Sequence, residues 1–149
     1  MQIHKVPIGS IIPDPENARR HPQRNIETLM GSLSMFGQQR PLVVWQNVVI
    51  AGNGTLEAAR ALGWSEIEIT RVPPDWDYDM ARAYALTDNR TSELSHWDPQ
   101  VLADQLLELD AVGWDVSDFG FAALQPPTDP EPLPEIPFGA PCPTCGRFT

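Results

Sequence analysis

Hydrophobic and polar positions in the N-terminal part of the chain follow two different spacings. Residues 6–12 are mostly apolar and β-branched but are interrupted by Pro7 and Gly9, which predicts a short edge strand and a turn. Over residues 26–36 the apolar side chains recur every three or four positions, as on one face of a helix. We therefore predict a helix there, with Asn25 as its N-cap.

The next segment reads as strands around a second helix. Residues 41–45 and 48–51 are apolar runs separated by Gln46 and Asn47, which predicts a tight hairpin. A helix is expected over roughly 55–62. Apolar and charged residues then alternate up to Val72, as in a half-exposed strand.

The C-terminal half is predicted to be helical and then extended. Helices are expected over 77–87 and 99–111, the second because Asp98 precedes Pro99 at the first helical position. A following aromatic cluster is expected to pack back on the body. Prolines become dense from residue 126, which is typical of an extended, mostly disordered tail.

These elements predict one α/β (α+β) domain with a small mixed sheet flanked by helices and a helical C-terminal extension. We place this domain at residues 1–125 and a Pro-rich tail at 126–149. The chain has 149 residues, 42% of them hydrophobic, enough for one domain with a core. It lacks an apolar run of membrane-spanning length and an apolar signal core at its start, so we expect a cytoplasmic protein without membrane contact.

Charge is distributed unevenly between the two halves. Residues 1–71 carry seven Lys/Arg and six Asp/Glu, whereas residues 72–149 carry three and fourteen, for a net charge of −10. A chain this acidic is a poor non-specific DNA binder, because that affinity comes from basic side chains. Either the acidity only aids solubility, or DNA is contacted by a group of four arginines in the N-terminal half, Arg19, Arg20, Arg24 and Arg40.

Two glycines mark the junction of a predicted strand and a predicted helix. Gly52-Asn53-Gly54-Thr55 lies where the backbone could approach a ligand closely, and a helix N-terminus presents N–H groups that suit phosphate. The same residues also fit a tight turn in which Thr55 caps the helix. The turn alone does not decide between a ligand site and a purely structural role.

The order of several motifs adds to this picture. The helix at 26–33, the Gly-x-x-x-Pro-Leu-Val-Val run at 37–44, the hairpin leading into 49–52 and the segment 85–94 follow one another as in ParB-type domains. The chain thus resembles, over residues 3–121, the N-terminal domain of the ParB/sulfiredoxin superfamily. Residues 88–98 look most like ParB-like domains from phages and from fusions to DNA methyltransferases.

The resemblance implies a nucleoside triphosphate and Mg²⁺ as cofactors. The implied nucleotide contacts lie around the glycine turn and in two arginines: Arg40, Gly52, Asn53, Gly54, Thr55 and Arg90. Asp88 and Asn89 match the metal-facing pair, and Asn17 and Arg19 match an early Pro/Arg-containing loop. Glu57 and Asp88 are the candidate catalytic carboxylates, although a Glu in the first helical turn also simply suits the helix dipole.

Two residues depart from the family pattern. Thr55 stands where ParB and sulfiredoxin carry a phosphate-gripping arginine, so a bidentate clamp is lost, and Arg60 or Arg90 are the candidates to replace it. Asn53 stands where sulfiredoxin-like proteins carry their reactive cysteine, which excludes peroxiredoxin repair. We also expect no helix-turn-helix domain of the kind that follows in chromosome-partitioning ParB proteins.

The resemblance therefore indicates a ParB-like nucleotide-binding protein of a phage or mobile-element DNA system. Magnesium-dependent phosphate-bond chemistry, as in an NTPase, kinase or nuclease, is one form of this hypothesis. The alternative is a non-catalytic adaptor that acts with a DNA methyltransferase or a terminase. DNA would be bound weakly or through a partner protein, and a homodimer is left open.

The remaining chemistry-bearing residues give weaker signals. Cys142 and Cys145 form a Cys-x-x-Cys pair, which is half of a zinc site because zinc ordinarily takes four ligands. Either a second chain or a distant histidine completes such a site, or the pair belongs to an unstructured tail. His21 and His96 are isolated in the sequence and are expected at the surface.

Overall fold

Five short strands form one mixed sheet, and the computed structural model describes residues 2–121. The strands are β1 (Ile3–Pro7), β2 (Ile12–Pro13), β3 (Leu42–Trp45), β4 (Val48–Ala51) and β5 (Glu66–Arg71). They are ordered β1-β5-β3-β4-β2 across the sheet. The β1–β5 and β3–β4 pairs are antiparallel, while β5–β3 and β4–β2 are parallel. The predicted hairpin is present, and Gln46 in its turn takes a φ of 55°.

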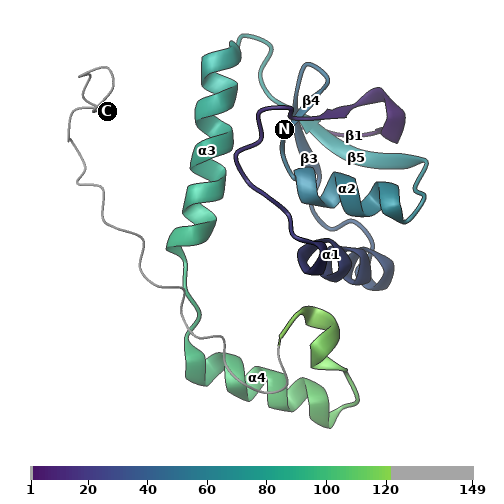
Figure 1. Ribbon diagram of the computed structural model, residues 1–149, viewed down its shortest axis with the longest axis vertical. Helices are drawn as coiled ribbons and strands as arrows, with labels where there is room; N and C mark the ends of the chain where they lie inside the picture. The colour runs from purple at the N-terminus through teal and green to yellow at the C-terminus, as the bar shows by residue number, and fades with distance from the viewer. Residues whose placement is uncertain (1, 122–149) are drawn as a thin grey trace, which may run out of the picture.

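Two helices cover one face of this sheet. They are α1 (Gln23–Phe36) and α2 (Asn53–Ala61), and they pack against each other beside the sheet (Figure 1). Side chains alternate between the two faces of a strand, so Leu42 and Val44 of β3 point together to the helical side. They are fully buried there with Ile26 of α1 and Leu56 of α2. This apolar cluster is the core that positions the β4–α2 junction.

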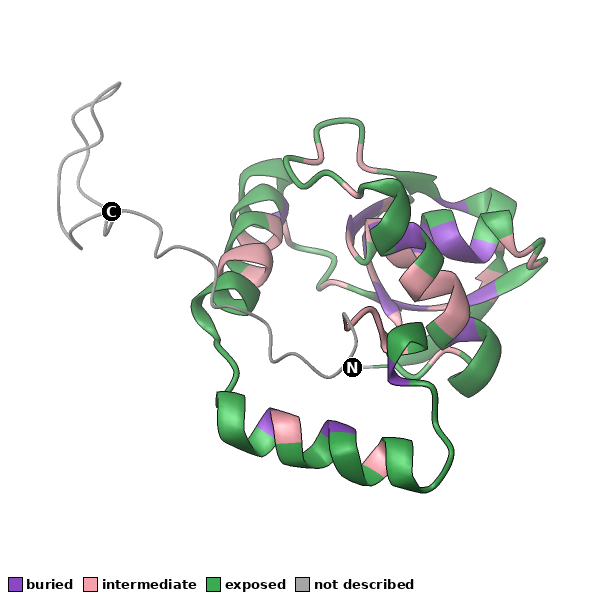
Figure 2. Cartoon of the chain, turned by 60° about the horizontal axis from the view of Figure 1, so that its bottom comes forward, coloured by how far each residue is buried: buried purple, intermediate pink, exposed green. Residues whose placement is uncertain are grey.

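The remaining helices are attached more lightly. The long helix α3 (Tyr78–Leu94) contacts β4, and Ala81 is its single buried residue. Helix α4 (Pro99–Ala111) packs on the 3-10 turn η2 (Val116–Phe119), and η2 in turn contacts α1. A second 3-10 turn, η1 (Ile8–Ser10), follows β1. Figure 2 shows that most of the surface of α3 and α4 is exposed.

Several predicted boundaries were wrong for identifiable reasons. Helix α1 begins at Gln23 rather than at residue 26, with Pro22 in the N-cap position, and the Asn25 side chain bonds His21 instead of capping. Helix α2 begins two residues early because Gly52 turns the chain directly into it. Helix α3 continues seven residues beyond 87, since no glycine or proline interrupts it.

Other local predictions were correct. Helix α4 has the predicted bounds, and the carboxylate of Asp98 accepts from the N–H groups of Gln100 and Val101, each at 3.0 Å. The aromatic cluster packs back on α1, because the Phe36 ring lies 6.1 Å from Trp114 and 6.4 Å from Phe119. The mixed sheet with flanking helices confirms the predicted fold class. The predicted boundary at residue 125 and the tail beyond it lie outside the described residues.

Among residues 2–121, no helix combines the length and the apolar character that crossing a membrane would require.

The two glycines with positive φ that flank α2 give a stability prediction. Gly52 has a φ of +95°, and a Cβ there would lie 2.6 Å from Cδ2 of the buried Leu42. Gly63 has a φ of +75° but open space around it. Gly52→Ala should lower the free energy of unfolding by about 2–4 kcal/mol, through backbone strain and overpacking together. Gly63→Ala should cost only about 1–2 kcal/mol of strain. Urea unfolding of both variants tests this, and equal losses would contradict the crowding at Leu42.

Candidate functional site

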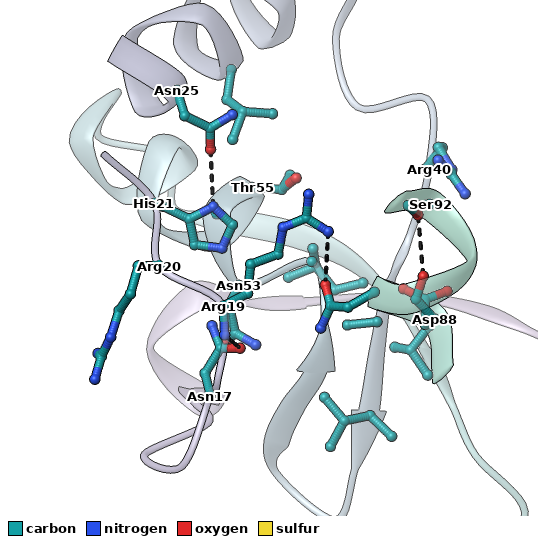
Figure 3. A pocket seen from close by; sticks show the side chains of 18 of the residues that line it. Asn17, Arg19, Arg20, His21, Asn25, Arg40, Asn53, Thr55, Asp88 and Ser92 are labelled. Carbon is teal, nitrogen blue, oxygen red and sulfur yellow. Dashed lines mark hydrogen bonds between the residues drawn. The ribbon is translucent and has the colours of Figure 1, made fainter. Parts of the chain in front are cut away.

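A cleft of about 530 Å³ lies where four segments of the chain meet (Figure 3). Its walls come from the loop 17–22 before α1, the start of β3, the β4–α2 junction and the middle of α3. Most of the residues predicted from the sequence as nucleotide contacts line it: Arg40, Gly52, Asn53, Gly54 and Thr55, with Asp88 and Asn89. We refer to this space as the cleft.

The β4–α2 junction places a helix N-terminus in the cleft. Gly52 adopts the left-handed conformation, with φ 95° and ψ 24°, so the chain passes from strand to helix without a loop. The first N–H groups of a helix have no partner within it and carry partial positive charge. An anionic group in the cleft would therefore meet backbone donors at residues 53–55.

Asn53 holds the neighbouring loop in place. Its Oδ1 accepts from the backbone N–H of Asp14 at 3.0 Å, and its Nδ2 donates to the carbonyl of Val49 at 2.8 Å. Both polar atoms of the amide therefore have hydrogen-bond partners within the protein. Asn53 lines the cleft, but its side chain serves first to tie the loop to the β4–α2 junction.

Gly54 makes room for a side chain. A Cβ at this position would lie 2.8 Å from the ring of His21 and 3.0 Å from Cδ1 of Leu29. The sequence left open whether this glycine serves a ligand or the turn, and in the structure it accommodates an imidazole. His21, expected at the surface, is half-buried and lines the cleft. Sequence reasoning missed this role because the contact joins residues 33 positions apart.

Three arginines line the cleft. Arg19 reaches across it, donating from Nη1 to Oδ1 of Asn89 on α3 at 3.1 Å, while Arg20 comes from the same loop and Arg40 from the segment before β3 (Figure 3). Asp88 is the one carboxylate among the lining residues described. The cleft is therefore cationic in a chain of net charge −10.

The arginines suggested as substitutes at position 55 lie elsewhere. Arg60 donates to the carbonyl of Ile11 at 2.8 Å, and Arg90 faces Glu93 at 3.5 Å; neither lines the cleft. Glu57 is exposed and lines a neighbouring cleft of about 540 Å³ on the other side of the loop. Of the two candidate catalytic carboxylates, only Asp88 therefore faces the cleft.

Tyr84 completes the α3 wall, although it lies outside the motifs that predicted the site. Its ring packs on Trp76 with centroids 5.5 Å apart. Partial burial and the nearby Asp88 carboxylate raise the pKa of the Tyr84 phenol above its ordinary value of 10.0, while Arg40 acts to lower that pKa. The phenol of Tyr84 is thus close enough to Asp88 and Arg40 for both charges to affect its pKa.

The two predicted metal sites are the Mg²⁺ pair at Asp88 and Asn89 and the zinc pair at Cys142 and Cys145. Within residues 2–121, no three His, Cys, Asp or Glu side chains gather as a metal centre. Oδ1 of Asn89 accepts from the cationic Arg19, which leaves Asp88 as the carboxylate able to hold Mg²⁺. One carboxylate suffices where phosphate oxygens supply further ligands. Cys142 and Cys145 lie outside the described residues.

No protein-family model and no curated protein sequence matches the chain. Several solved structures, however, match the fold of the chain. A C-terminally truncated chromosome-partitioning protein ParB from Caulobacter crescentus, complexed with CTP-γ-S, matches with a TM-score of 0.66 and 16% identity, over 80% of this chain and 69% of that one. The chain has the ParB N-terminal domain fold. A pNOB8-like ParB N-domain matches with a TM-score of 0.51 and 26% identity, over 74% of this chain and 48% of that one.

The C. crescentus protein complexed to the centromeric parS site matches with a TM-score of 0.50 and 16% identity, over 80% of this chain and 65% of that one. The chain thus spans about two thirds of the C. crescentus structures and about half of the pNOB8-like one. The ParB-type fold confirms the resemblance inferred from the order of the motifs.

The electrostatic contacts of Tyr84 can be tested without any ligand. The chain has two tyrosines, so a Tyr78→Phe background leaves Tyr84 alone to be titrated by ultraviolet absorbance. Asp88→Asn removes a cause that raises the pKa of Tyr84 and should lower it, whereas Arg40→Gln should raise it further. Arg71→Gln, whose side chain bonds the hairpin at Gln46, is the control. An unchanged pKa in both cleft variants would mean that these groups do not converge.

Proposed function

We propose that the cleft binds a nucleoside triphosphate and that the chain is a ParB-like nucleotide-binding protein of a DNA-handling system. The observation that carries the proposal is the meeting of a helix N-terminus with three arginines in one cleft of about 530 Å³. Backbone N–H groups and guanidinium groups are the donors that bind phosphate most effectively. The structural similarity to a ParB solved with CTP-γ-S supports the same ligand class.

We assign the residues of the cleft to two groups of ligand contacts. The N–H groups at the start of α2 and the Arg19 and Arg20 side chains would hold the phosphates. Arg40 and Tyr84 would contact the ligand from the opposite side. The volume lies within the range of roughly 300–1,000 Å³ that small-molecule sites occupy.

Mg²⁺ fits this arrangement through Asp88. When bound, the ion would supply charge neutralisation of the phosphates, as metal ions do in phosphoryl transfer. Asp88 is the one carboxylate of the described cleft, and this favours binding with slow turnover or none over nuclease chemistry. We also infer a phage or mobile-element setting from the resemblance of residues 88–98. The alternative function in that setting is a non-catalytic adaptor that acts with a DNA methyltransferase or a terminase.

The decisive experiment is a binding screen of the full-length chain against the four ribonucleoside triphosphates with and without Mg²⁺. Phosphate release is then measured for each nucleotide that binds. Binding with release supports an enzyme, and binding without release supports an adaptor. If none of the four nucleotides binds at millimolar concentration, the proposal is wrong.

Arginine substitutions test the placement of the ligand. Arg19→Ala and Arg40→Ala should each weaken nucleotide affinity by about 10- to 100-fold, the usual effect of losing a hydrogen bond to a charged group. Arg71→Ala, which removes an arginine outside the cleft, should change affinity less than about twofold. Calorimetric titration measures all three. Equal affinities in wild type and both cleft variants would place the nucleotide elsewhere.

Direct DNA binding, where it occurs, should be weak and salt-sensitive. Of the four arginines expected to contact DNA, Arg24 already donates to the carbonyl of Gly120 at 3.1 Å and Arg19 to Asn89. Four arginines neutralise at most about four phosphates, so the logarithm of affinity should fall against the logarithm of salt with a slope no steeper than about −3.6. Fluorescence anisotropy across a salt series measures this slope. A steeper slope would reveal a DNA surface beyond this cluster.

A further inference from the structure

His21 lies among the groups proposed to bind phosphate. It lies near the end of the loop that carries Arg19 and Arg20, two residues before α1. Its half-buried side chain lines both the cleft and the neighbouring cleft beside Glu57. A titratable ring therefore lies between two arginines and a helix N-terminus.

The ring is fixed from two sides. Its Nδ1 lies 2.9 Å from Oδ1 of Asn25, one helical turn further along the chain. The opposite support is Gly54, where even a Cβ would lie 2.8 Å from Cε1 and Nδ1 of the ring. The imidazole therefore lies directly against the first turn of α2, in space that any larger residue at position 54 would fill.

This arrangement leaves the second ring nitrogen available. An amide oxygen accepts only from a protonated nitrogen, so the bond to Asn25 places a proton on Nδ1. Nε2 lies on the side of the ring away from Asn25 (Figure 3), and no group within residues 2–121 forms a hydrogen bond with it. In the neutral ring Nε2 is an acceptor, which cannot donate to a phosphate oxygen. A second proton makes it a charged donor.

We propose that His21 is a phosphate-binding residue of this site and that it contacts the ligand through a protonated Nε2. The inference rests on the proposed nucleotide-binding function and names one of its contacts. Histidine is the side chain whose charge ordinarily changes between pH 5 and 8. Nucleotide affinity should therefore rise as the pH falls through this range, because a nearby anion favours the charged ring.

Charged groups of both signs line the two clefts together with His21. Arg19 and Arg20 lie on its own loop and Asp14 at the start of that loop, Arg40 lies before β3, Asp88 on α3, and Glu57 and Arg60 on α2. Helix α1 places no charged side chain at these contacts: Asn25 bonds the His21 ring, and Leu29 lies beside Gly54. A bound triphosphate adds negative charge among these groups, so binding should draw a proton onto the ring.

The test compares His21→Gln with wild type at about pH 6 and about pH 8, using the full-length chain. The ligand is the nucleotide that binds most tightly in the screen, and inorganic tripolyphosphate is a second probe that lacks the nucleoside. Titration of the ligand itself is common to both proteins and cancels in the ratio of their Kd values. We expect His21→Gln to weaken binding by about tenfold or more at the lower pH and less than about threefold at the higher pH.

His96→Gln is the matched control, because His96 is exposed between α3 and α4 and does not line the cleft. It should leave affinity and its pH dependence unchanged. At neutral pH, calorimetry of wild type in two buffers with different ionisation enthalpies should show proton uptake on binding. His21→Gln should lose that uptake.

The outcomes separate the two proposals. An equal loss of affinity at both pH values would assign His21 a structural role only, and unchanged affinity at both would remove it from the site. Either result overturns the inference while nucleotide binding by wild type stands. If wild type binds neither the nucleotides nor tripolyphosphate, the proposed function and this inference fail together. Thermal melting of His21→Gln verifies that the variant is folded under the conditions used.

Discussion

The side-chain amide of Asn53 connects three parts of the chain at the cleft: the loop at Asp14, strand β4 and the start of α2. Its oxygen accepts from the backbone of Asp14 and its nitrogen donates to the backbone of Val49, while Asn53 itself begins α2. The loop that follows Asp14 carries Arg19 and Arg20, two of the three arginines of the cleft, and a loop without secondary structure has no ladder of its own to fix it. One amide with both of its polar atoms satisfied therefore sets the distance between that loop and the helix N-terminus.

The two glycines around Asn53 serve this arrangement in different ways. Gly52 supplies the left-handed backbone that lets α2 begin at once, against the buried Leu42. Gly54 has no need of positive φ; it leaves space for the ring of His21. The Gly-x-Gly pattern at a strand–helix junction thus has a structural explanation at each glycine, and the ligand is left to contact N–H groups and side chains around them.

Sequence reasoning succeeded where structure is determined locally and failed where distant contacts decide it. The Asp98-Pro99 start of α4 was predicted to the residue because a cap and a first-turn proline act within a few positions. The Asn25 cap was wrong because the oxygen of Asn25 is used by His21. The motif order predicted the fold, and most of the residues it singled out line the cleft. It could not show that Glu57 faces another cleft or that Tyr84 lines this one, because both facts depend on how α3 and the loop pack against the sheet.

The two walls of the cleft differ in how much apolar surface they bury. The β4–α2 side belongs to the main core, where Leu42, Val49 and Leu56 are fully buried. The α3 side is attached through Ala81, through the ring of Tyr78 against Trp45, and through the side-chain bonds from Arg19 to Asn89 and from Tyr78 to Glu16, with most of its surface exposed. Segments with few buried apolar contacts open at lower free energy than the core. The helix N-terminus therefore fixes where an anion can sit, and the position of α3 depends more strongly on what occupies the cleft. Because Arg19 is both a donor to Asn89 and a candidate phosphate ligand, an anion that attracts its guanidinium acts on one of the few contacts holding α3.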